Sequence, residues 1–157
     1  MNLFIRAYRE SDTRQIMTLF YETIHAINRR DYNPEQIDTW APAEMDDARW
    51  AETLRQRTTF VAENDGLIVG FAELEEDGHI NRFYCHKDYQ GCGIGTRLLA
   101  AIEAEAQQRG ITRLFTEASI TAHPFFTKRG FQTLQEQTVV VRNVAFRNYR
   151  MEKTWER

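Results

Sequence analysis

Residues 89–99 of this chain read Tyr-Gln-Gly-Cys-Gly-Ile-Gly-Thr-Arg-Leu-Leu. Three glycines at alternate positions do not serve a packed core, because glycine has no side chain to bury and loses the most conformational entropy on folding. An amphipathic run follows directly, so the loop leads straight into a helix. A helix N-terminus carries unpaired N–H donors and a partial positive charge, which together bind phosphate. The stretch therefore predicts a pyrophosphate-binding loop in the middle of the chain.

The first third of the chain is expected to form one strand followed by helices. A weakly alternating strand is predicted over residues 3–7, and Ser11 has the chemistry of an N-cap for a helix whose apolar residues recur as far as Ile27. Further helices are predicted over residues 33–40, where proline takes a first-turn position, and over residues 46–57.

Strand patterns dominate the rest of the chain, apart from one long helix after the glycine loop. Strands are predicted over 59–63, 67–75 and 79–85, the first two joined by an Asn-Asp-Gly hairpin turn; a helix follows over 94–109, then a strand over 113–116, a short helix over 121–129, and strands over 131–142 and 144–153. This order predicts an α/β fold with a central mixed, mostly antiparallel sheet of about seven strands and helices on both faces. No linker composition interrupts it, so we expect one domain over residues 1–157.

Composition excludes several classes of function. The net charge of −3 provides no basic footprint, so we expect no nucleic-acid partner. No apolar run approaches the roughly 20 residues that a membrane span needs, and the N-terminus lacks the layout of a signal peptide. Cys85 and Cys92 are too few for a disulfide framework, which predicts reduced thiols in a cytoplasmic protein.

The glycine loop does not match two common phosphate-binding motifs. A Walker-type loop needs Gly-Lys-Ser/Thr after four spacer residues, which this stretch lacks. The dinucleotide pattern G-x-G-x-x-G would need glycine at Thr96 or Leu98. The remaining pattern is Q-x-x-G-x-G, formed by Gln90, Gly93 and Gly95 after an expected antiparallel strand.

In this pattern the chain resembles the GNAT superfamily of N-acetyltransferases, whose acetyl-coenzyme A loop is written Q/R-x-x-G-x-G/A. Residues 119–131 read Ser-Ile-Thr-Ala-His-Pro-Phe-Phe-Thr-Lys-Arg-Gly-Phe. They resemble the family's N-x-x-A-x-x-F/L-Y-x-K-x-G-F element. The order of expected elements is similar as well, so the resemblance covers essentially the whole chain. Within the superfamily it is most similar to short bacterial proteins that carry S-I-T-A-x-P-F-F.

The resemblance implies acetyl-CoA as the acetyl donor and a defined set of residues around it. Backbone amides of residues 90–96 would hold the pyrophosphate, and the main chain of residues 83–85 would pair with pantetheine like an added strand. Ser119 takes the place of the family's asparagine, and Lys128 is expected to reach the phosphates. The residues expected to bind the coenzyme are Phe83, Tyr84, Cys85, Gln90, Gly91, Cys92, Gly93, Ile94, Gly95, Thr96, Ser119, Phe126 and Lys128.

The chain departs from the family at the proton donor. Acetyl transfer to an amine needs a stabilised oxyanion, for which we expect the Tyr84 backbone N–H, and a proton for the departing thiolate. The family's tyrosine is replaced by Phe126, which cannot donate. Three accounts are open: another group such as Tyr84, Cys85 or His123 donates; solvent does; or the protein binds acetyl-CoA without turning it over.

The general base is a choice among residues of the central strands. His79 has a reference pKa near 6.5 that suits the task, while Glu73 and Glu75 share one face of the expected strand 67–75. The alternative interpretation of each of these residues is a polar side chain that faces water and has no catalytic role. The catalytic residues we expect are therefore Tyr84, His79 and Glu73.

The acceptor is expected to be the primary amine of a small molecule. His25, Tyr32, Trp40 and Trp50 lie in the region that the family uses for substrate, although packing explains the tryptophans equally well. Basic residues of the last expected hairpin form either an anion site or a solvated edge, namely Arg142, Arg147 and Arg150.

The expected function is cytoplasmic N-acetyl transfer directly from acetyl-CoA to the amine in a ternary complex. A non-catalytic acyl-CoA-binding sensor is the alternative that the change to Phe126 keeps open. The spacing of Cys85, His86 and Cys92 matches no zinc motif, so no metal is expected. We also expect no membrane partner, and a monomer or homodimer.

Overall fold

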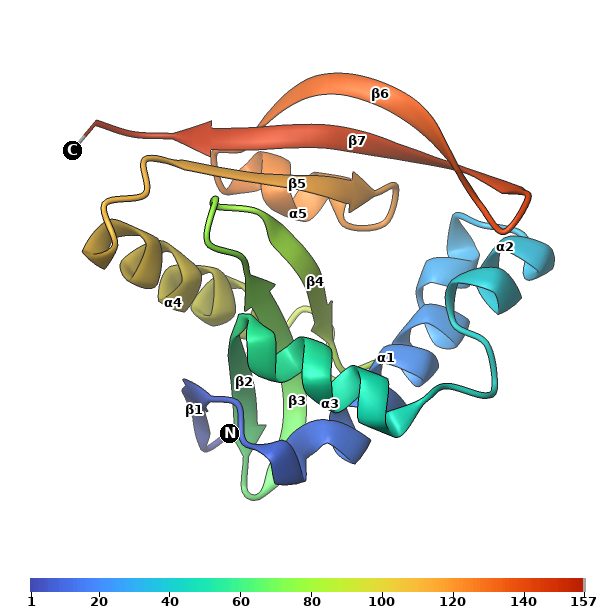
Figure 1. Ribbon diagram of the computed structural model, residues 1–157, viewed down its shortest axis with the longest axis horizontal. Helices are drawn as coiled ribbons and strands as arrows, with labels where there is room; N and C mark the ends of the chain where they lie inside the picture. Colours follow the sequence, from blue (N-terminus) through green and yellow to red (C-terminus); the bar gives the residue numbers. More distant parts are fainter. Residues whose placement is uncertain (157) are drawn as a thin grey trace.

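The computed structural model describes residues 1–156, and Figure 1 shows how its elements are arranged. In chain order the strands and α-helices are β1 (Leu3–Ala7), α1 (Thr13–Ala26), α2 (Pro34–Trp40), α3 (Asp47–Gln56), β2 (Thr58–Asn64), β3 (Leu67–Leu74), β4 (Ile80–Cys85), α4 (Ile94–Gln108), β5 (Arg113–Ser119), α5 (His123–Lys128), β6 (Gln132–Val141) and β7 (Val144–Thr154). The predicted α/β fold with mostly antiparallel strands is confirmed.

The N-cap prediction for the first helix is wrong. Ser11 lies within a short 3-10 turn, Glu10–Asp12, and α1 begins two residues later at Thr13. Asp12 organises this turn, because its carboxylate accepts the Arg9 backbone N–H at 2.8 Å and the Arg6 guanidinium at 2.8 and 2.9 Å.

The sheet divides into two parts between β4 and β5. One sheet has the strand order β1-β2-β3-β4 and the other β5-β7-β6, and every strand pair within them is antiparallel. The two sheets touch at one end through an isolated parallel bridge between His79 and Phe115. The Thr116 hydroxyl also donates to the Ile80 carbonyl there, at 2.9 Å. Beyond this contact β4 and β5 diverge, so the expected continuous sheet is open on one side.

A β-bulge in β4 accompanies the divergence. Ala72 pairs with Phe83 and Leu74 pairs with Ile80, so Asn81 and Arg82 together oppose the single residue Glu73. An extra residue on one strand bends that strand and increases its local twist. The bulge therefore turns β4 away from β5 and re-aims the side chains of the two bulged residues.

Helices cover both faces of the β1–β4 sheet, as predicted. Helix α4 packs on one face, and α1 and α3 pack on the other (Figure 1). Leu98 and Ile102 of α4 are fully buried against the first face, while Ile24 of α1 and Leu54 of α3 are fully buried against the second. Among the helices of residues 1–156, none has both the length and the apolar character needed to cross a membrane.

Candidate active site

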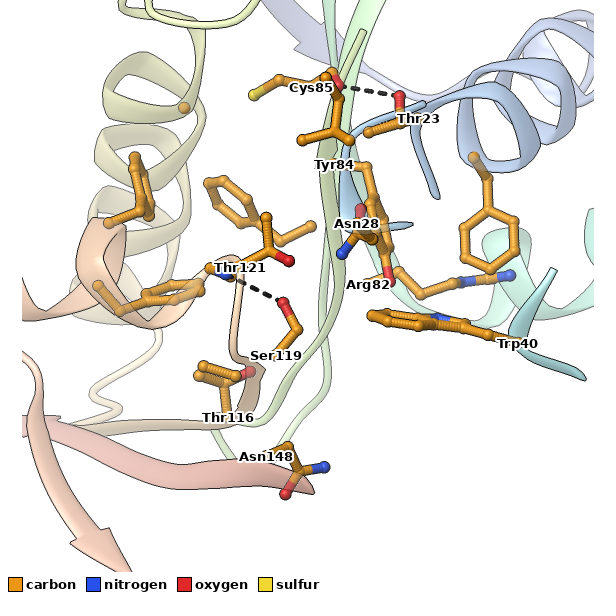
Figure 2. Close-up of a pocket in the computed structure, with 18 of the residues that line it drawn as sticks. Thr23, Asn28, Trp40, Arg82, Tyr84, Cys85, Thr116, Ser119, Thr121 and Asn148 are labelled. Atoms are coloured by element: carbon orange, nitrogen blue, oxygen red, sulfur yellow. Dashed lines mark hydrogen bonds between the residues drawn. The ribbon is translucent and has the colours of Figure 1, made fainter. Parts of the chain in front are cut away.

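A cavity of about 520 Å³ lies where the two sheets diverge. Its walls come from α1, β4, the glycine loop, β5, α5 and the β6–β7 hairpin, as Figure 2 shows in close-up. Twelve of the residues expected at the site line this cavity: Phe83, Tyr84, Cys85, Gln90, Gly91, Cys92, Gly93, Ile94, Gly95, Thr96, Ser119 and Phe126.

The glycine loop presents unpaired backbone donors to the cavity. Gly93 is the N-cap of α4 at φ +83°, a conformation that side-chain-bearing L residues rarely adopt. The first intrahelical hydrogen bond runs from the Arg97 N–H to the Gly93 carbonyl at 3.2 Å, so the N–H groups of the three residues between them precede it. The N-cap makes no side-chain hydrogen bond, and the first turn of α4 contains no acidic residue. This helix start therefore offers its donors and its partial positive charge to an anion.

The loop is closed at both ends by specific contacts. The Gln90 side chain donates to the Cys85 carbonyl at 2.9 Å, which holds the loop against the end of β4. A Cβ atom on Gly95 would lie 2.7 Å from the Phe125 ring, so only glycine lets α5 pack this closely on the start of α4. The glycines thus serve the loop conformation at Gly93 and close packing at Gly95.

The direction of the main-chain groups of β4 shows that the Tyr84 N–H does not have the role we expected. The His86 N–H donates to the Val69 carbonyl of β3, at 2.8 Å. Because main-chain groups alternate along an antiparallel strand, those of Tyr84 also point toward β3, whereas those of Phe83 and Cys85 point toward the gap. The Tyr84 N–H is therefore directed away from the cavity and is not the oxyanion donor we expected. The Cys85 carbonyl is already occupied by Gln90 and by the Thr23 hydroxyl, at 3.0 Å (Figure 2).

The Tyr84 side chain faces the other part of the cavity. Its ring packs edge-on against Phe20 at 5.1 Å and stacks on Phe71 at 5.9 Å. Figure 2 places Tyr84 beside Trp40 on the α1 side of β4. Burial raises the pKa of the Tyr84 hydroxyl, so the group stays protonated at neutral pH and can donate a hydrogen bond.

Phe126 cannot donate a proton, and Cys85 is not a nucleophile at neutral pH. Phe126 is 2 % exposed and packs on Phe83 and Phe131, with ring centroids 5.5 and 5.0 Å apart. Burial raises the pKa of the Cys85 thiol to about 12, so the nucleophilic thiolate is not populated at neutral pH.

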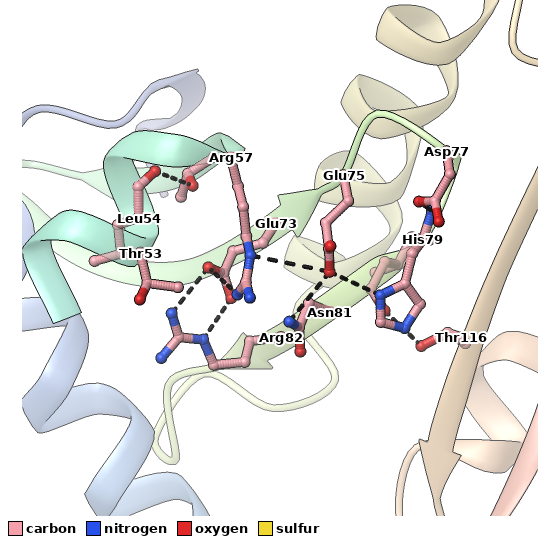
Figure 3. Close-up of polar contacts among 12 residues, drawn as sticks. Thr53, Leu54, Arg57, Glu73, Glu75, Asp77, His79, Asn81, Arg82 and Thr116 are labelled. Carbon is pink, nitrogen blue, oxygen red and sulfur yellow. Dashed lines mark hydrogen bonds and ion pairs between the residues drawn. The ribbon is translucent and has the colours of Figure 1, made fainter. Parts of the chain in front are cut away.

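Glu73, expected as a candidate base, does not line the cavity. It is fully buried and accepts hydrogen bonds from the guanidinium groups of Arg82 and Arg57, the latter at 3.0 Å (Figure 3). The bulge places this carboxylate behind Arg82, whose guanidinium stacks 3.8 Å from the centroid of the Trp50 ring. Glu73 therefore positions Arg82, which does line the cavity, and does not itself reach the lining.

His79 and Lys128 also lie outside the cavity lining. His79 is held between two carboxylates, with Nδ1 2.8 Å from Glu75 and Nε2 2.7 Å from Glu117. The hydrogen bond to Glu117, together with that to Glu75, raises the pKa of His79 to about 9 despite burial, so the imidazole is protonated at neutral pH and cannot accept a proton. Lys128 is exposed, and the next residue, Arg129, lines the cavity instead.

The acceptor-side predictions divide in the same way. Tyr32, Trp40 and Arg142 line the cavity, whereas four other candidates do not: His25, Trp50, Arg147 and Arg150. Trp50 packs its ring against Phe20 at 4.9 Å.

Asn28 is a cavity residue that sequence reasoning missed. It is 4 % exposed, and its side-chain amide makes no hydrogen bond to any of residues 1–156. Figure 2 shows this amide on the same side of the gap as Tyr84. The available signal in the sequence was that Asn28 directly follows Ile27, the last apolar residue of the first helical pattern. That position alone does not reveal a cavity.

The comparisons with known proteins agree with this geometry. Residues 28–153 match the family described as acetyltransferase (GNAT) domain. The chain is 33 % identical over 151 residues to the uncharacterized N-acetyltransferase YafP of Escherichia coli (strain K12), covering 96 % of this chain and 95 % of that relative. It belongs to the GNAT family of acetyltransferases.

Two solved structures extend the comparison. The GCN5-related N-acetyltransferase of Rhodopseudomonas palustris is 35 % identical, with a TM-score of 0.93 over 99 % of this chain and 97 % of that one. The PaiA N-acetyltransferase of Thermoplasma acidophilum, solved in complex with coenzyme A, shares the fold at 20 % identity, with a TM-score of 0.83 over 99 % of this chain and 100 % of that one.

Proposed function

We propose that this acetyltransferase uses acetyl-CoA to acetylate the primary amine of a small molecule by direct transfer in a ternary complex. The observation that carries the proposal is that one cavity is lined both by the start of α4 and by the open edge of β4. A phosphate anchor and a strand edge beside each other suit a donor with a pyrophosphate and two pantetheine amides. The coenzyme complex of the Thermoplasma acidophilum protein supports the same donor.

The two ends of the donor would bind different parts of the chain. The pyrophosphate accepts hydrogen bonds from the N–H groups at the start of α4. The pantetheine amides pair with the outward-facing main chain of Phe83 and Cys85. The Cys85 carbonyl is already occupied as an acceptor, so it is not free to pair with a pantetheine amide. The N–H groups of Phe83 and Cys85 point toward the gap, and one of them stabilises the oxyanion.

The chemical step joins the amine nitrogen to the acetyl carbon and then breaks the carbon–sulfur bond. Glu73 and His79 are outside the cavity, and the hydrogen bond from His79 lowers the pKa of Glu117, which does line it. The amine therefore loses its proton to water, and the thiolate of coenzyme A gains a proton. The Tyr84 hydroxyl, which burial keeps protonated, is the proposed hydrogen-bond donor to the departing sulfur, and the proton that the thiolate takes comes from water, in exchange for the proton that the amine released. The raised pKa of Cys85 favours direct transfer over an acetyl-cysteine intermediate.

The acceptor would bind between α1, α2 and the β6–β7 hairpin. This part of the cavity is walled by Phe20, Trp40 and Phe146 and carries the unpaired amide of Asn28. Enclosing walls with few polar groups are typical of small-molecule sites. The free thiols of Cys85 and Cys92 support action in a reducing compartment such as the cytoplasm.

The test measures acetyl-CoA binding by thermal shift and turnover by release of free coenzyme A thiol over a panel of primary amines. We expect stabilisation by acetyl-CoA and thiol release with part of the panel. Stabilisation without turnover would favour an acyl-CoA sensor, which the buried Phe126 also fits. No stabilisation would overturn the donor assignment.

A matched pair of glycine variants separates binding from folding. Gly93→Asp places a carboxylate at the proposed anion site, so acetyl-CoA should no longer raise the midpoint of thermal unfolding. Gly66→Asp introduces the same side chain at a similar φ, +85° against +83°, with open space around both, but in the β2–β3 turn. An acetyl-CoA shift that survives in Gly93→Asp, or that is lost equally in Gly66→Asp, would contradict the pyrophosphate role.

A further inference from the structure

Arg129 occupies an electrostatically unusual position at the end of α5. Its guanidinium donates to the Thr96 hydroxyl from Nε at 3.1 Å and from Nη2 at 2.7 Å, and to the Phe125 carbonyl from Nη1 at 3.1 Å. It also stacks over the Phe125 ring, 3.9 Å from the centroid. Since Thr96 is the third residue of α4, these contacts hold a full positive charge beside the first turn of that helix.

A cation at this end of a helix is unfavourable unless an anion joins it. The helix macrodipole places its positive pole at the N-terminus, where acidic groups are stabilising and basic groups are not. The usual compensation is missing here, because the first turn of α4 has no acidic residue and no carboxylate of residues 1–156 forms an ion pair with Arg129. Its three hydrogen bonds fix the guanidinium in place but leave its charge unbalanced.

Other basic residues near the loop do not share this arrangement. Arg97 is also in the first turn of α4, but its guanidinium donates to the Leu3 carbonyl at 2.8 Å and does not line the cavity. Lys128 is exposed and likewise outside the lining. Arg129 lines the cavity, and its charge extends to Cys85, where it opposes the effect of burial on the thiol pKa.

We infer that Arg129 binds a phosphate group of the coenzyme A moiety and supplies the side-chain charge that complements the backbone donors of the glycine loop. Guanidinium is suited to this, because its planar set of donors matches phosphate oxygens and its charge strengthens each hydrogen bond. The inference rests on the proposed function and deepens it, by moving the phosphate-binding cation from the expected Lys128 to Arg129. Thr96 and Phe125 are positioning residues for this guanidinium.

The experiment compares donors with and without nucleotide phosphates. For Arg129→Gln we expect the Kd of acetyl-CoA to rise about tenfold or more, as loss of a charged hydrogen bond predicts, and the rise to shrink with added salt. S-acetylpantetheine has no pyrophosphate or 3′-phosphate, so its kcat/KM should stay within about twofold of wild type. Lys128→Gln is the matched control, and it should leave the Kd of acetyl-CoA and the kcat/KM of S-acetylpantetheine within about twofold of wild type.

Two further measurements separate a charge effect from a structural one. Arg129→Lys keeps the charge and should retain most of the acetyl-CoA affinity. Dephospho-coenzyme A, which lacks only the 3′-phosphate, tells which phosphate is bound. If Arg129→Gln also weakens the binding of dephospho-coenzyme A, Arg129 binds the pyrophosphate. If the affinity for dephospho-coenzyme A is unchanged, Arg129 binds the 3′-phosphate.

Failure of the inference is distinct from failure of the proposed function. Wild-type protein that does not bind acetyl-CoA would overturn both. Wild-type binding with an unchanged Arg129→Gln variant, or an equal loss for acetyl-CoA and S-acetylpantetheine, would overturn the role of Arg129 alone.

Discussion

Asn28 presents to the cavity a side-chain amide that has no hydrogen-bond partner among residues 1–156. The residue is 4 % exposed, but no fully buried side-chain N or O atom in that range lacks a partner, so the amide itself opens into the cavity. The neighbouring Tyr84 and Arg82 are also polar cavity residues, but Arg82 already binds Glu73. The acceptor, or water that it displaces, is the remaining partner for Asn28.

Substituting Asn28 should therefore change acceptor binding without weakening the fold. For Asn28→Ala we expect the KM of the acceptor to rise about tenfold, because the variant removes a polar group that the cavity presents to the acceptor. The KM of acetyl-CoA should stay within about twofold, and the midpoint of thermal unfolding should not fall. Steady-state kinetics with each substrate varied in turn, together with thermal unfolding, checks these values.

Asn33 is the matched control. Its side chain accepts the Gln36 N–H at 2.8 Å and caps α2, so Asn33→Ala should cost about 1 kcal/mol of stability and leave both KM values unchanged. If Asn28→Ala instead raised the KM of acetyl-CoA alone, Asn28 would belong to the donor site.

At the scale of elements, Tyr32 joins the N-terminal helices to the C-terminal sheet. Its hydroxyl donates to the Arg147 carbonyl of β7 at 2.7 Å and accepts the Ile120 N–H, just after β5, at 2.9 Å. The ring packs against Trp40 and Phe146, at 5.2 and 6.1 Å. One side chain thus fixes the wall of the cavity that α2 and β7 share.

The variant Tyr32→Phe keeps the ring packing but leaves two backbone groups without their partner. We expect it to lower the free energy of unfolding by about 1–3 kcal/mol in urea titration. Tyr21→Phe is the control, because the Tyr21 hydroxyl makes no hydrogen bond to any residue in the described range, 1–156. Equal stability of the two variants would show that the Tyr32 hydroxyl does not hold the elements together.

At the scale of the whole molecule, a charged network closes the narrow end of the gap between the sheets. His79 binds Glu75, just after β3 (Figure 3). Its other ring nitrogen binds Glu117 of β5, and the backbone bridge from His79 to Phe115 lies at the same point. The network therefore lies where the two sheets meet, at the closed end of the gap between β4 and β5.

The network makes stability depend on pH in a defined direction. The pKa of His79 is raised from 6.5 to about 9 by Glu117 and Glu75, with Asp77 and Arg57 as the other charged neighbours. A histidine whose pKa is raised by folding stabilises the folded state fully at a pH below its pKa in the unfolded chain. This contribution is lost as the pH rises through its pKa in the folded protein. We expect a loss on the order of 1–3 kcal/mol between pH 6.5 and pH 9.

The comparison for this prediction is His79→Gln, which keeps hydrogen-bonding capacity but does not titrate. Urea unfolding at several pH values should show wild type more stable at pH 6.5, with the difference shrinking toward pH 9. A difference that is constant over this range would show that the charge on His79 does not stabilise the junction between the sheets.

Local patterns in the sequence determined much of the fold and the donor side of the site. Glycine conformation and the start of a long amphipathic helix identified the loop before α4, and that helix ends within one residue of its predicted end. Weak alternation located β1, and the hairpin turn signal located β3, with similar accuracy, because each signal depends on residues close together in the chain.

Only the tertiary structure decided which side chains meet in the cavity. The bulge in β4 directs Glu73 into an ion-pair network, and strand alternation turns the main chain of Tyr84 toward β3. Packing of α5 on Gly95 brings Arg129, rather than Lys128, to the glycine loop and the start of α4. These outcomes depend on register, twist and long-range packing, in which a shift of one residue reverses the direction of a side chain. No local sequence pattern specifies them.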